Sequence, residues 1–177
     1  MGARETRNPI LLIMLGFCLA SGTARGQDAA PAQADPAKPQ NAWVVNCSTG
    51  TSGTAFECQM SQNLTASNTG QRVLTVTIRK NAADGGMAML FALPHGLFLP
   101  AGASYQIDAG AKAQVAIQTS DQNGAYAAVP MDDKLIGALK AGTTLNVGME
   151  SVGRKEVVIP VSLAGFTAAI DKLASLK

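Results

Sequence analysis

Apolar residues recur at every second position in several short segments between residues 43 and 161, and this pattern constrains the fold most. The alternation is regular in 74–78 and 145–149, where Leu, Val, Ile or Met occupies every second position. Successive side chains of a strand point to opposite faces, so this period predicts half-buried β-strands. Turn residues separate the segments at close intervals. The sequence therefore predicts an all-β, antiparallel sandwich, with a barrel as the alternative.

Three segments depart from this period. The continuous apolar run Met87–Leu93 predicts a strand that is buried on both faces or lies inside a sandwich. Residues 131–141 have helical spacing, and Asp132 or Asp133 can cap this helix while Gly142 ends it. Residues 165–176 form a second amphipathic pattern. We therefore expect one or two short helices beside the strands.

Residues 1–26 have the organisation of a secretory signal peptide. Arg4 and Arg7 precede an apolar run of 11 residues, and small residues follow it. The small residues at 24 and 26 predict cleavage before Gln27, and cleavage after residue 22 or 24 is the alternative. A transmembrane anchor is the other interpretation, but a membrane span requires about 20 apolar residues. The sequence thus predicts export through a cleaved signal peptide, to the periplasm, to the cell surface or into the medium, and no integral span in the mature chain.

The remaining chain divides into a linker and one domain. Residues 27–40 are rich in Ala, Pro and Gln without apolar periodicity, which is typical of a flexible linker. The β-sandwich domain is then predicted at 41–177. Removal of residues 1–26 takes away three arginines and one glutamate, so the formal net charge falls from +2 to 0. No basic patch remains, and nucleic acid is not an expected partner.

Export also bears on the cysteines. Cys18 leaves with the signal peptide, while Cys47 and Cys58 remain as an even pair in an oxidising compartment. A disulfide between Cys47 and Cys58 is therefore predicted. Two buried free thiols are the alternative.

The sequence offers no catalytic constellation. One His and three Cys are too few for three-histidine or four-cysteine metal sites. His95 lies in a predicted turn without a nucleophile or an orienting group nearby. Asp132 and Asp133 are interpreted as helix-capping residues, while 84–86 and 154–156 are interpreted as hairpin turns. We therefore predict no catalytic residue, no metal site and no cofactor.

One short segment is a candidate for contact with a partner. Leu97, Phe98 and Leu99 follow a Pro-His-Gly turn and precede Pro100. Exposed apolar patches mark interaction sites, so these three residues could meet a protein or a membrane. The alternative is that these three side chains are buried in the hydrophobic core.

Several segments in fixed order together resemble the invasion-associated locus B family of bacterial envelope proteins. They are Trp43–Cys47 followed by Cys58, Leu93–Gly102, Tyr105–Asp108, Asn123–Ala128, Leu135–Gly142, and Ile159–Phe166 with Ala168 and Ala169. The resemblance implies an immunoglobulin-like β-sandwich, export in alphaproteobacteria and no enzymatic activity. Some members of this family are linked to virulence through host-cell invasion.

One departure from the family concerns the hairpin at 121–124. The family carries a second cysteine pair around this turn, where this chain has Ser120 and Ala125. The turn should place Ser120 and Ala125 opposite each other. Without that disulfide we expect the hairpin to be mobile, held only by its ladder and by side chains at 115, 117 and 126.

Two functions are compatible with these observations. The first is a non-enzymatic exported protein that acts through contact with an unidentified protein of the cell envelope or of a host. The alternative is a periplasmic small-ligand-binding module or an unrecognised hydrolase. A deep pocket with converging polar groups would favour the alternative.

Overall fold

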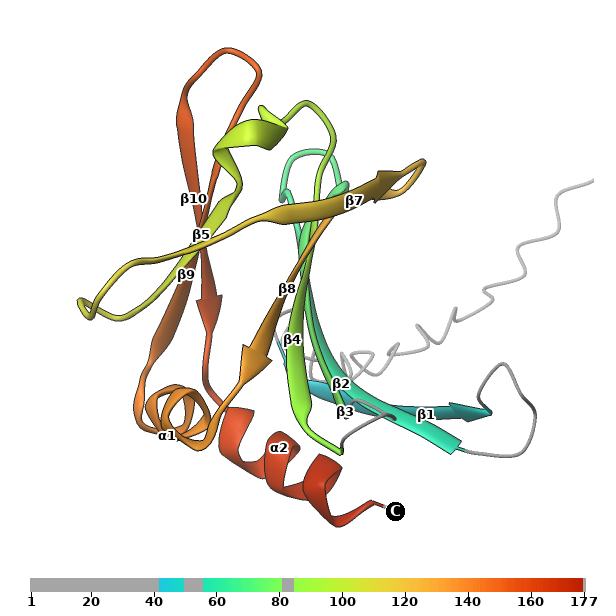
Figure 1. Cartoon of the computed structure of the whole chain (residues 1–177). Coiled ribbons are helices and arrows are strands. Elements are labelled where there is room, and N and C mark those ends of the chain that lie inside the picture. Colours follow the sequence, from blue (N-terminus) through green and yellow to red (C-terminus); the bar gives the residue numbers. More distant parts are fainter. Residues whose placement is uncertain (1–41, 50–55, 81–84, 177) are drawn as a thin grey trace, which may run out of the picture. The chain divides into compact units, whose positions relative to one another are not determined.

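The computed structural model describes residues 42–49, 56–80 and 85–176 (Figure 1). Within these ranges the strands are β1 (Val44–Thr49), β2 (Phe56–Thr65), β3 (Arg72–Lys80), β4 (Met87–Leu93), β5 (Ala103–Ile107), β6 (Ala113–Val115), β7 (Ile117–Asp121), β8 (Gly124–Met131), β9 (Thr144–Glu150) and β10 (Glu156–Ser162). The helices are η1 (Leu99–Ala101), a 3-10 helix, and the α-helices α1 (Asp133–Ala141) and α2 (Phe166–Ser175). The predicted signal peptide (1–26), the linker (27–40) and Asp84 lie outside the described residues.

The larger sheet contains six antiparallel strands in the order β1-β2-β3-β4-β8-β7. Its inner face carries the alternating apolar residues that the sequence predicts: Leu74, Val76 and Ile78 of β3 are fully buried. In β4, alternate residues from Met89 to Leu93 are fully buried, whereas the residues between them are only half-buried. The apolar run Met87–Leu93 is therefore a strand inside a sandwich, and it is not fully buried on both faces.

The smaller sheet contains four antiparallel strands in the order β10-β9-β5-β6. Leu145, Val147 and Met149 of β9 are at most 4% exposed, so this sheet also buries its alternating apolar face. The buried residues of both sheets form one hydrophobic cluster. The all-β, antiparallel sandwich predicted from the sequence is thus confirmed.

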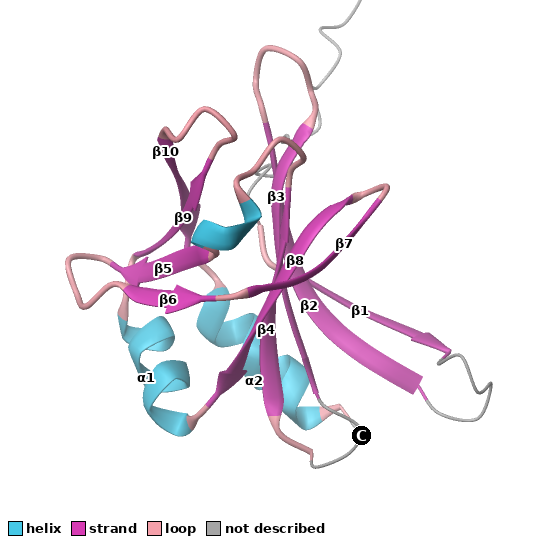
Figure 2. Ribbon diagram, turned by 45° about the horizontal axis from the view of Figure 1, so that its top comes forward, coloured by secondary structure: helices cyan, strands magenta, loops and turns pink. Residues whose placement is uncertain are grey.

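One extended segment connects the two sheets. The sequence predicts a single strand carrying Val115 and Ile117, but the structure interrupts it at Ala116. On one side of this break β6 pairs with β5, and on the other side β7 pairs with β8. The segment therefore leaves the smaller sheet to become an edge of the larger one (Figure 2).

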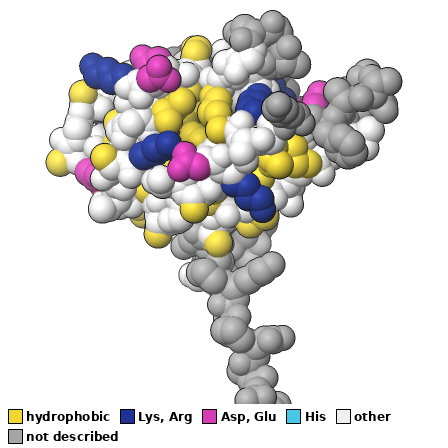
Figure 3. All heavy atoms as spheres, turned by 90° about the horizontal axis from the view of Figure 1, so that it is seen from below, with side chains coloured by type: hydrophobic (Ala, Val, Ile, Leu, Met, Phe, Trp, Pro, Cys, Tyr) yellow, Lys and Arg dark blue, Asp and Glu magenta, His cyan; other side chains and the backbone are white. Residues whose placement is uncertain are grey.

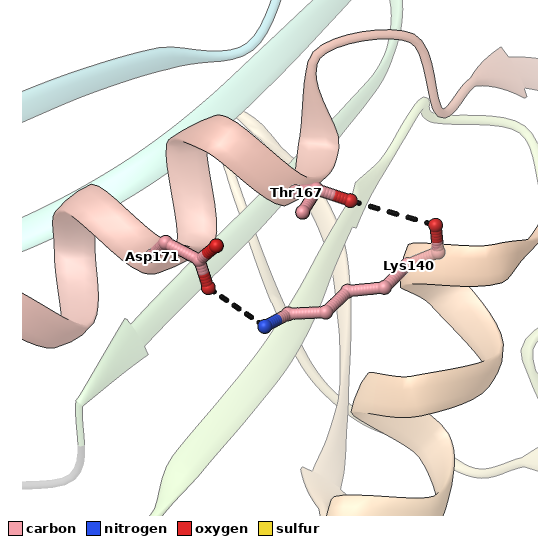
Figure 4. A network of polar contacts seen from close by, with 3 residues as sticks. All are labelled: Lys140, Thr167 and Asp171. Atoms are coloured by element: carbon pink, nitrogen blue, oxygen red, sulfur yellow. Dashed lines mark hydrogen bonds and ion pairs between the residues drawn. The ribbon is translucent and has the colours of Figure 1, made fainter.

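Both α-helices lie at one end of the sandwich (Figure 1). Asp132 caps α1, accepting a hydrogen bond from the backbone N–H of Leu135 at 2.7 Å, and Gly142 ends the helix. The two predicted helices are thus confirmed. Lys140 joins α1 to α2, because its Nζ lies 2.7 Å from Asp171 and its carbonyl accepts from the hydroxyl of Thr167 (Figure 4). Seen from below, hydrophobic patches on this end are interrupted by charged side chains (Figure 3).

Trp43 ties the start of the larger sheet to the end of the smaller one. Its indole N–H donates to the backbone carbonyl of Ser162 at 3.0 Å. Its ring meets that of Phe166 edge-on, with centroids 5.2 Å apart. Edge-to-face aromatic pairs contribute about 0.5–1.5 kcal/mol beyond their burial. This contact also fixes the first residue of α2 against the sheet.

Candidate functional site

The segment 94–102 and the β9–β10 turn at 151–155 form one surface, which we call the apical surface. Leu97 pairs with Ser151 as an isolated β-bridge. The backbone N–H of Phe98 donates to Glu150, and that of Val152 donates to Gly96, at 2.8 and 2.9 Å. Figure 1 shows η1 beside the turn between β9 and β10 at the top of the molecule. Backbone hydrogen bonds therefore hold the two loops together.

The conformation of the first loop follows from its Pro-Ala-Gly sequence. Pro100 lies in the first turn of η1, where its missing N–H is not required. Gly102 has a φ of 72°, and a Cβ there would come within 2.6 Å of the carbonyl oxygen of Val115. Its N–H closes η1 on the carbonyl of Leu99 at 2.9 Å. Glycine is therefore required at position 102.

The three predicted contact residues have different environments. Leu97 is half-buried and packs against the core. Phe98 is half-buried under the guanidinium of Arg154, which lies 3.8 Å from its ring centroid. Leu99 is 43% exposed. Of the three, only Leu99 is exposed rather than half-buried, and contact with a partner stays a prediction.

Sequence reasoning missed Val152. This residue lies in the β9–β10 turn and is 70% exposed, the highest value among the exposed large hydrophobic side chains of the described part. An isolated valine between Ser151 and Gly153 gives no periodic signal, but an apolar residue at a polar hairpin tip is unusual enough to be noticed. Leu99 and Val152 are the exposed large apolar side chains of the apical surface.

A cleft of about 200 Å³ lies beside the apical surface. It is lined by Ala101, Gly102, Ala103, Ser104, Lys112, Gln114, Gly148, Met149, Glu150, Arg154 and Glu156. Lys112 pairs with Glu156 across the sheet, and Arg154 pairs with Glu150 at 2.9 Å. The segment 154–156 is thus at a hairpin tip, as predicted, but the charges of Arg154 and Glu156 are paired. The cleft is open, because the side chains of Glu156 and Arg154 are 59% and 60% exposed.

His95 has a structural contact. Its Nε2 lies 3.0 Å from the backbone carbonyl oxygen of Gln122, in the β7–β8 turn. The imidazole is exposed, and it connects the Pro-His-Gly turn to this hairpin. Nε2 of His95 thus contacts a backbone carbonyl, whereas the imidazole of a catalytic triad contacts a nucleophilic side chain.

The β7–β8 hairpin has the predicted register, because Ser120 lies opposite Ala125. The expectation that only its ladder and three side chains hold it is wrong. Arg72 donates from Nη1 to Ala92 at 3.0 Å and from Nη2 to the carbonyl of Asn123. The partners of Arg72 lie 20 and 51 positions away in the sequence, so patterns among neighbouring residues do not reveal these contacts.

A carboxylate organises the same hairpin. Asp121 accepts hydrogen bonds from the backbone N–H of Asn123 at 2.7 Å and from the hydroxyl of Tyr126 at 3.0 Å. The first of these bonds is the main reason that the pKa of Asp121 is below its ordinary 3.8. Desolvation, followed by the hydrogen bond to Asp121, raises the pKa of Tyr126 above its ordinary value.

Asp108 performs a similar task at the opposite end of β5. Its φ is 48°, and its carboxylate accepts from the hydroxyl of Thr143 at 2.6 Å and from the N–H of Thr144 at 2.9 Å. The side-chain hydrogen bond from Thr143, with the backbone bonds from Thr143 and Thr144, lowers the pKa of Asp108. The hydrogen bonds of Asp108 thus connect the end of β5 to the start of β9. In the described part of the chain no group of three His, Cys, Asp or Glu residues could hold a metal ion.

Cys47 and Cys58 lie directly opposite each other in β1 and β2 and form a disulfide with a Cα–Cα distance of 4.0 Å. Cys47 is exposed and Cys58 is half-buried, so the alternative of two buried free thiols is wrong. The bridge lies two residue pairs from the Thr49–Phe56 end of the β1–β2 pair, far in sequence from the apical surface.

Comparison with known proteins places these features in a family context. The model of the family "Invasion associated locus B (IalB) protein" matches residues 43–174. Two invasion protein B homologs of Brucella abortus, from strains 2308 and 9-941, are each 38% identical over 135 residues, which is 76% of this chain and 76% of each relative. The crystal structure of invasion associated protein B from Bartonella henselae matches with a TM-score of 0.66 and 25% identity, covering 74% of this chain and 89% of that chain.

Proposed function

The chain belongs to the invasion-associated locus B family, and on this premise we propose that it is an exported, non-enzymatic protein that binds another protein through its apical surface. The partner is a protein of the cell envelope or of a host cell. The proposal rests on one observation: Leu99 and Val152 are exposed apolar side chains on a surface whose backbone is fixed by hydrogen bonds.

The distribution of exposed apolar side chains supports this surface. Five large hydrophobic side chains are exposed in the described ranges. Leu99 and Val152 are apical, Val157 and Val158 lie in β10 directly after the apical turn, and Val44 lies in β1. Four of the five therefore belong to the apical surface or to the strand that leaves it. Apolar anchors inside a polar rim are the usual centre of a protein interface.

The contact is made by side chains rather than by strand addition. β10 is an edge strand of the smaller sheet, so one of its sides is available for pairing. Pro160 lies within it and has no backbone N–H, a feature that protects edge strands against pairing with another chain. The carbonyl of Ser162 on this strand already accepts from Trp43. A partner would therefore engage Leu99 and Val152.

Rigidity of the apical surface favours affinity. The loop 94–102 is fixed by η1, by Gly102 and by the two backbone hydrogen bonds of the Leu97–Ser151 bridge. Arg154 is held by both the Phe98 ring and Glu150. A surface ordered before binding loses less conformational entropy on association. The described residues contain no helix long and apolar enough to cross a membrane.

Export is the second part of the proposal. It is supported by the order of residues 1–26 and by the disulfide between Cys47 and Cys58, a bond typical of oxidising compartments. N-terminal sequencing of protein recovered from the periplasm should find a start near Gln27. Recovery of an intact Met1 form in the membrane fraction would contradict export by a cleaved signal peptide.

A capture experiment tests the binding surface. Mature protein immobilised at its C-terminus is incubated with extracts of the source cell envelope and, in parallel, of host cells. The double variant Leu99→Ser, Val152→Ser should lose a species that the wild type retains, because full burial of a Leu or Val side chain contributes about 1.5–3 kcal/mol. Val44→Ser is the matched control, since Val44 is 47% exposed but lies in β1. Equal capture by all three proteins would refute the assignment of this surface.

The alternative functions have less support. A hydrolase requires a nucleophile and a base in contact, whereas His95 contacts a backbone carbonyl. A dedicated ligand-binding module normally encloses a cavity of about 300 Å³ or more. The cleft beside the apical surface is smaller and open, so it is considered as a secondary site below.

A further inference from the structure

A glycine leaves room at the floor of the cleft beside the apical surface. Gly148 lies between Ser104 and Val158 on the outer face of the smaller sheet. A Cβ at position 148 would collide with the hydroxyl oxygen of Ser104 and would lie 3.8 Å from Oε1 of Glu156. The missing side chain therefore creates the open space between the hydroxyl and the carboxylate.

Ser104 is the second observation that points to a ligand. The residue is only 4% exposed, yet it lines the cleft. Its hydroxyl oxygen is not itself fully buried: it reaches the cleft and makes no hydrogen bond to another residue of the described part. A hydroxyl held at the wall of an open cavity can donate to, and accept from, a bound polar group.

The charged walls supply both donors and acceptors. Each ion pair uses one carboxylate oxygen, that of Glu156 with Lys112 and that of Glu150 with Arg154. A carboxylate has about four acceptor sites and a guanidinium has five N–H donors, so capacity remains on both sides of the cleft. The amide of Gln114 adds one more group of each kind.

We propose that this cleft binds one neutral sugar unit, such as a hexose within a longer glycan. Sugar hydroxyls both donate and accept, which matches alternating carboxylates, N–H donors, a hydroxyl and an amide. A neutral polyol can use the remaining hydrogen-bonding capacity of the cleft. The charges of the walls are already neutralised as ion pairs, so the charged groups of an amino acid or other zwitterion would gain little net attraction to offset their desolvation. The volume of about 200 Å³ is below that of drug-sized sites and suits a single ring. The open sides let the glycan continue into solvent.

A titration followed by NMR tests this site. Mature, ¹⁵N-labelled protein is titrated separately with glucose, galactose and mannose to about 100 mM, above the millimolar dissociation constants expected from so few hydrogen bonds. At least one hexose should shift the amide signals of Ser104 and Gly148 in a saturable manner. Glycine at the same concentration should not. Absence of saturable shifts with all three hexoses, or saturable binding of glycine at these amides, would overturn the proposal.

Matched variants locate the binding. Ser104→Ala should weaken hexose binding about tenfold through loss of one hydrogen-bonding group. Gly148→Ala should abolish it, and a dispersed spectrum shows whether this variant is folded; if it is not, Ser104→Ala decides. Val158→Thr, on the same face but outside the lining residues, should bind as the wild type does. Unchanged binding in Ser104→Ala would refute the site.

This inference can be tested separately from the proposed protein contact, although Ala101, Gly102 and Arg154 belong to both the cleft and the apical surface. Leu99 does not line the cleft, so Leu99→Ser should lose partner capture and retain hexose binding. Loss of hexose binding in Leu99→Ser would contradict the assignment of the sugar to the cleft.

Discussion

Replacing Arg72 by methionine should loosen the β7–β8 hairpin. The guanidinium of Arg72 donates to the carbonyls of Ala92 in β4 and Asn123 in the turn, so one side chain clamps the hairpin to the larger sheet. Methionine keeps the length of the apolar stem and removes both donors. The change therefore isolates the hydrogen bonds from the packing.

The expected loss can be worked from these two bonds. A hydrogen bond from a charged donor contributes about 1.5–3 kcal/mol when it is shielded from water, and less when it is exposed. The bond to Ala92 is partly buried and that to Asn123 is exposed. Water can replace the donor at Asn123 but only incompletely at Ala92. We expect a total loss of about 2 kcal/mol, which corresponds to about a 30-fold change in an opening equilibrium.

Hydrogen exchange measures this effect locally. The amides of residues 122–126 should exchange about 30-fold faster in Arg72→Met, while core amides of β3 change little. Arg79→Met is the matched control, because Arg79 is exposed on the same strand. If the hairpin in Arg72→Met is as protected as in the wild type, the clamp does not stabilise it and the reasoning is refuted.

The register of this hairpin offers a rescue. Directly opposed Cβ atoms lie about 4.5–5.5 Å apart, close to the span of a disulfide. Ser120 and Ala125 are opposed, so Ser120→Cys with Ala125→Cys should oxidise on export. So short a loop gains about 2 kcal/mol at most, which would offset the loss in Arg72→Met. A double variant that stays reduced would contradict this geometry.

Three further predictions concern stability. Replacing Cys47 and Cys58 by serine opens a loop with a sequence separation of 11 and should lower the free energy of unfolding by about 3 kcal/mol in urea; an unchanged midpoint would contradict this. Hydrogen bonds hold the pKa of Asp108 below its ordinary 3.8. The ionised carboxylate therefore stabilises the fold above that pH, and this contribution is lost as the pH falls through the lower pKa of the folded state. In urea unfolding measured at several pH values, Asp108→Asn should reduce the fall of the free energy of unfolding at acid pH. Gly124 has a φ of 143°, and a Cβ there would meet the backbone carbonyl of Leu93, so Gly124→Ala should lower the free energy of unfolding by more than about 2 kcal/mol. Gly70 has a φ of 67° but lies in open space, so Gly70→Ala should lower it by only about 1 kcal/mol in the same assay.

Local patterns were sufficient for most of the strands and for both α-helices. Alternation at 74–78 and 145–149 identified the buried faces of β3 and β9, and the cap at Asp132 and the stop at Gly142 marked α1. These features depend on neighbours within a few residues. The sequence therefore predicted the sandwich and its helices.

Features that depend on distant contacts were not predictable. The strand is broken at Ala116 because the residues before it pair with β5 of the smaller sheet and the residues after it pair with β8 of the larger sheet. The apical surface requires the loop 94–102 to meet a turn about fifty residues later, so the neighbours of Val152 in the sequence do not show that it lies beside this loop. The cleft likewise appears only when Gly148 is placed beside Ser104 in adjacent strands.

Site-specific photocross-linking in intact cells tests the central claim, that the apical surface meets a partner protein. A photoreactive amino acid is placed at Leu99 in one protein and at the similarly exposed Val44 in another. After irradiation of the source cells, and of these cells mixed with host cells, Leu99 should yield a discrete cross-linked protein that is absent from the Val44 sample. Cross-links at Val44 alone, the same pattern at both positions, or none at Leu99 would contradict the account.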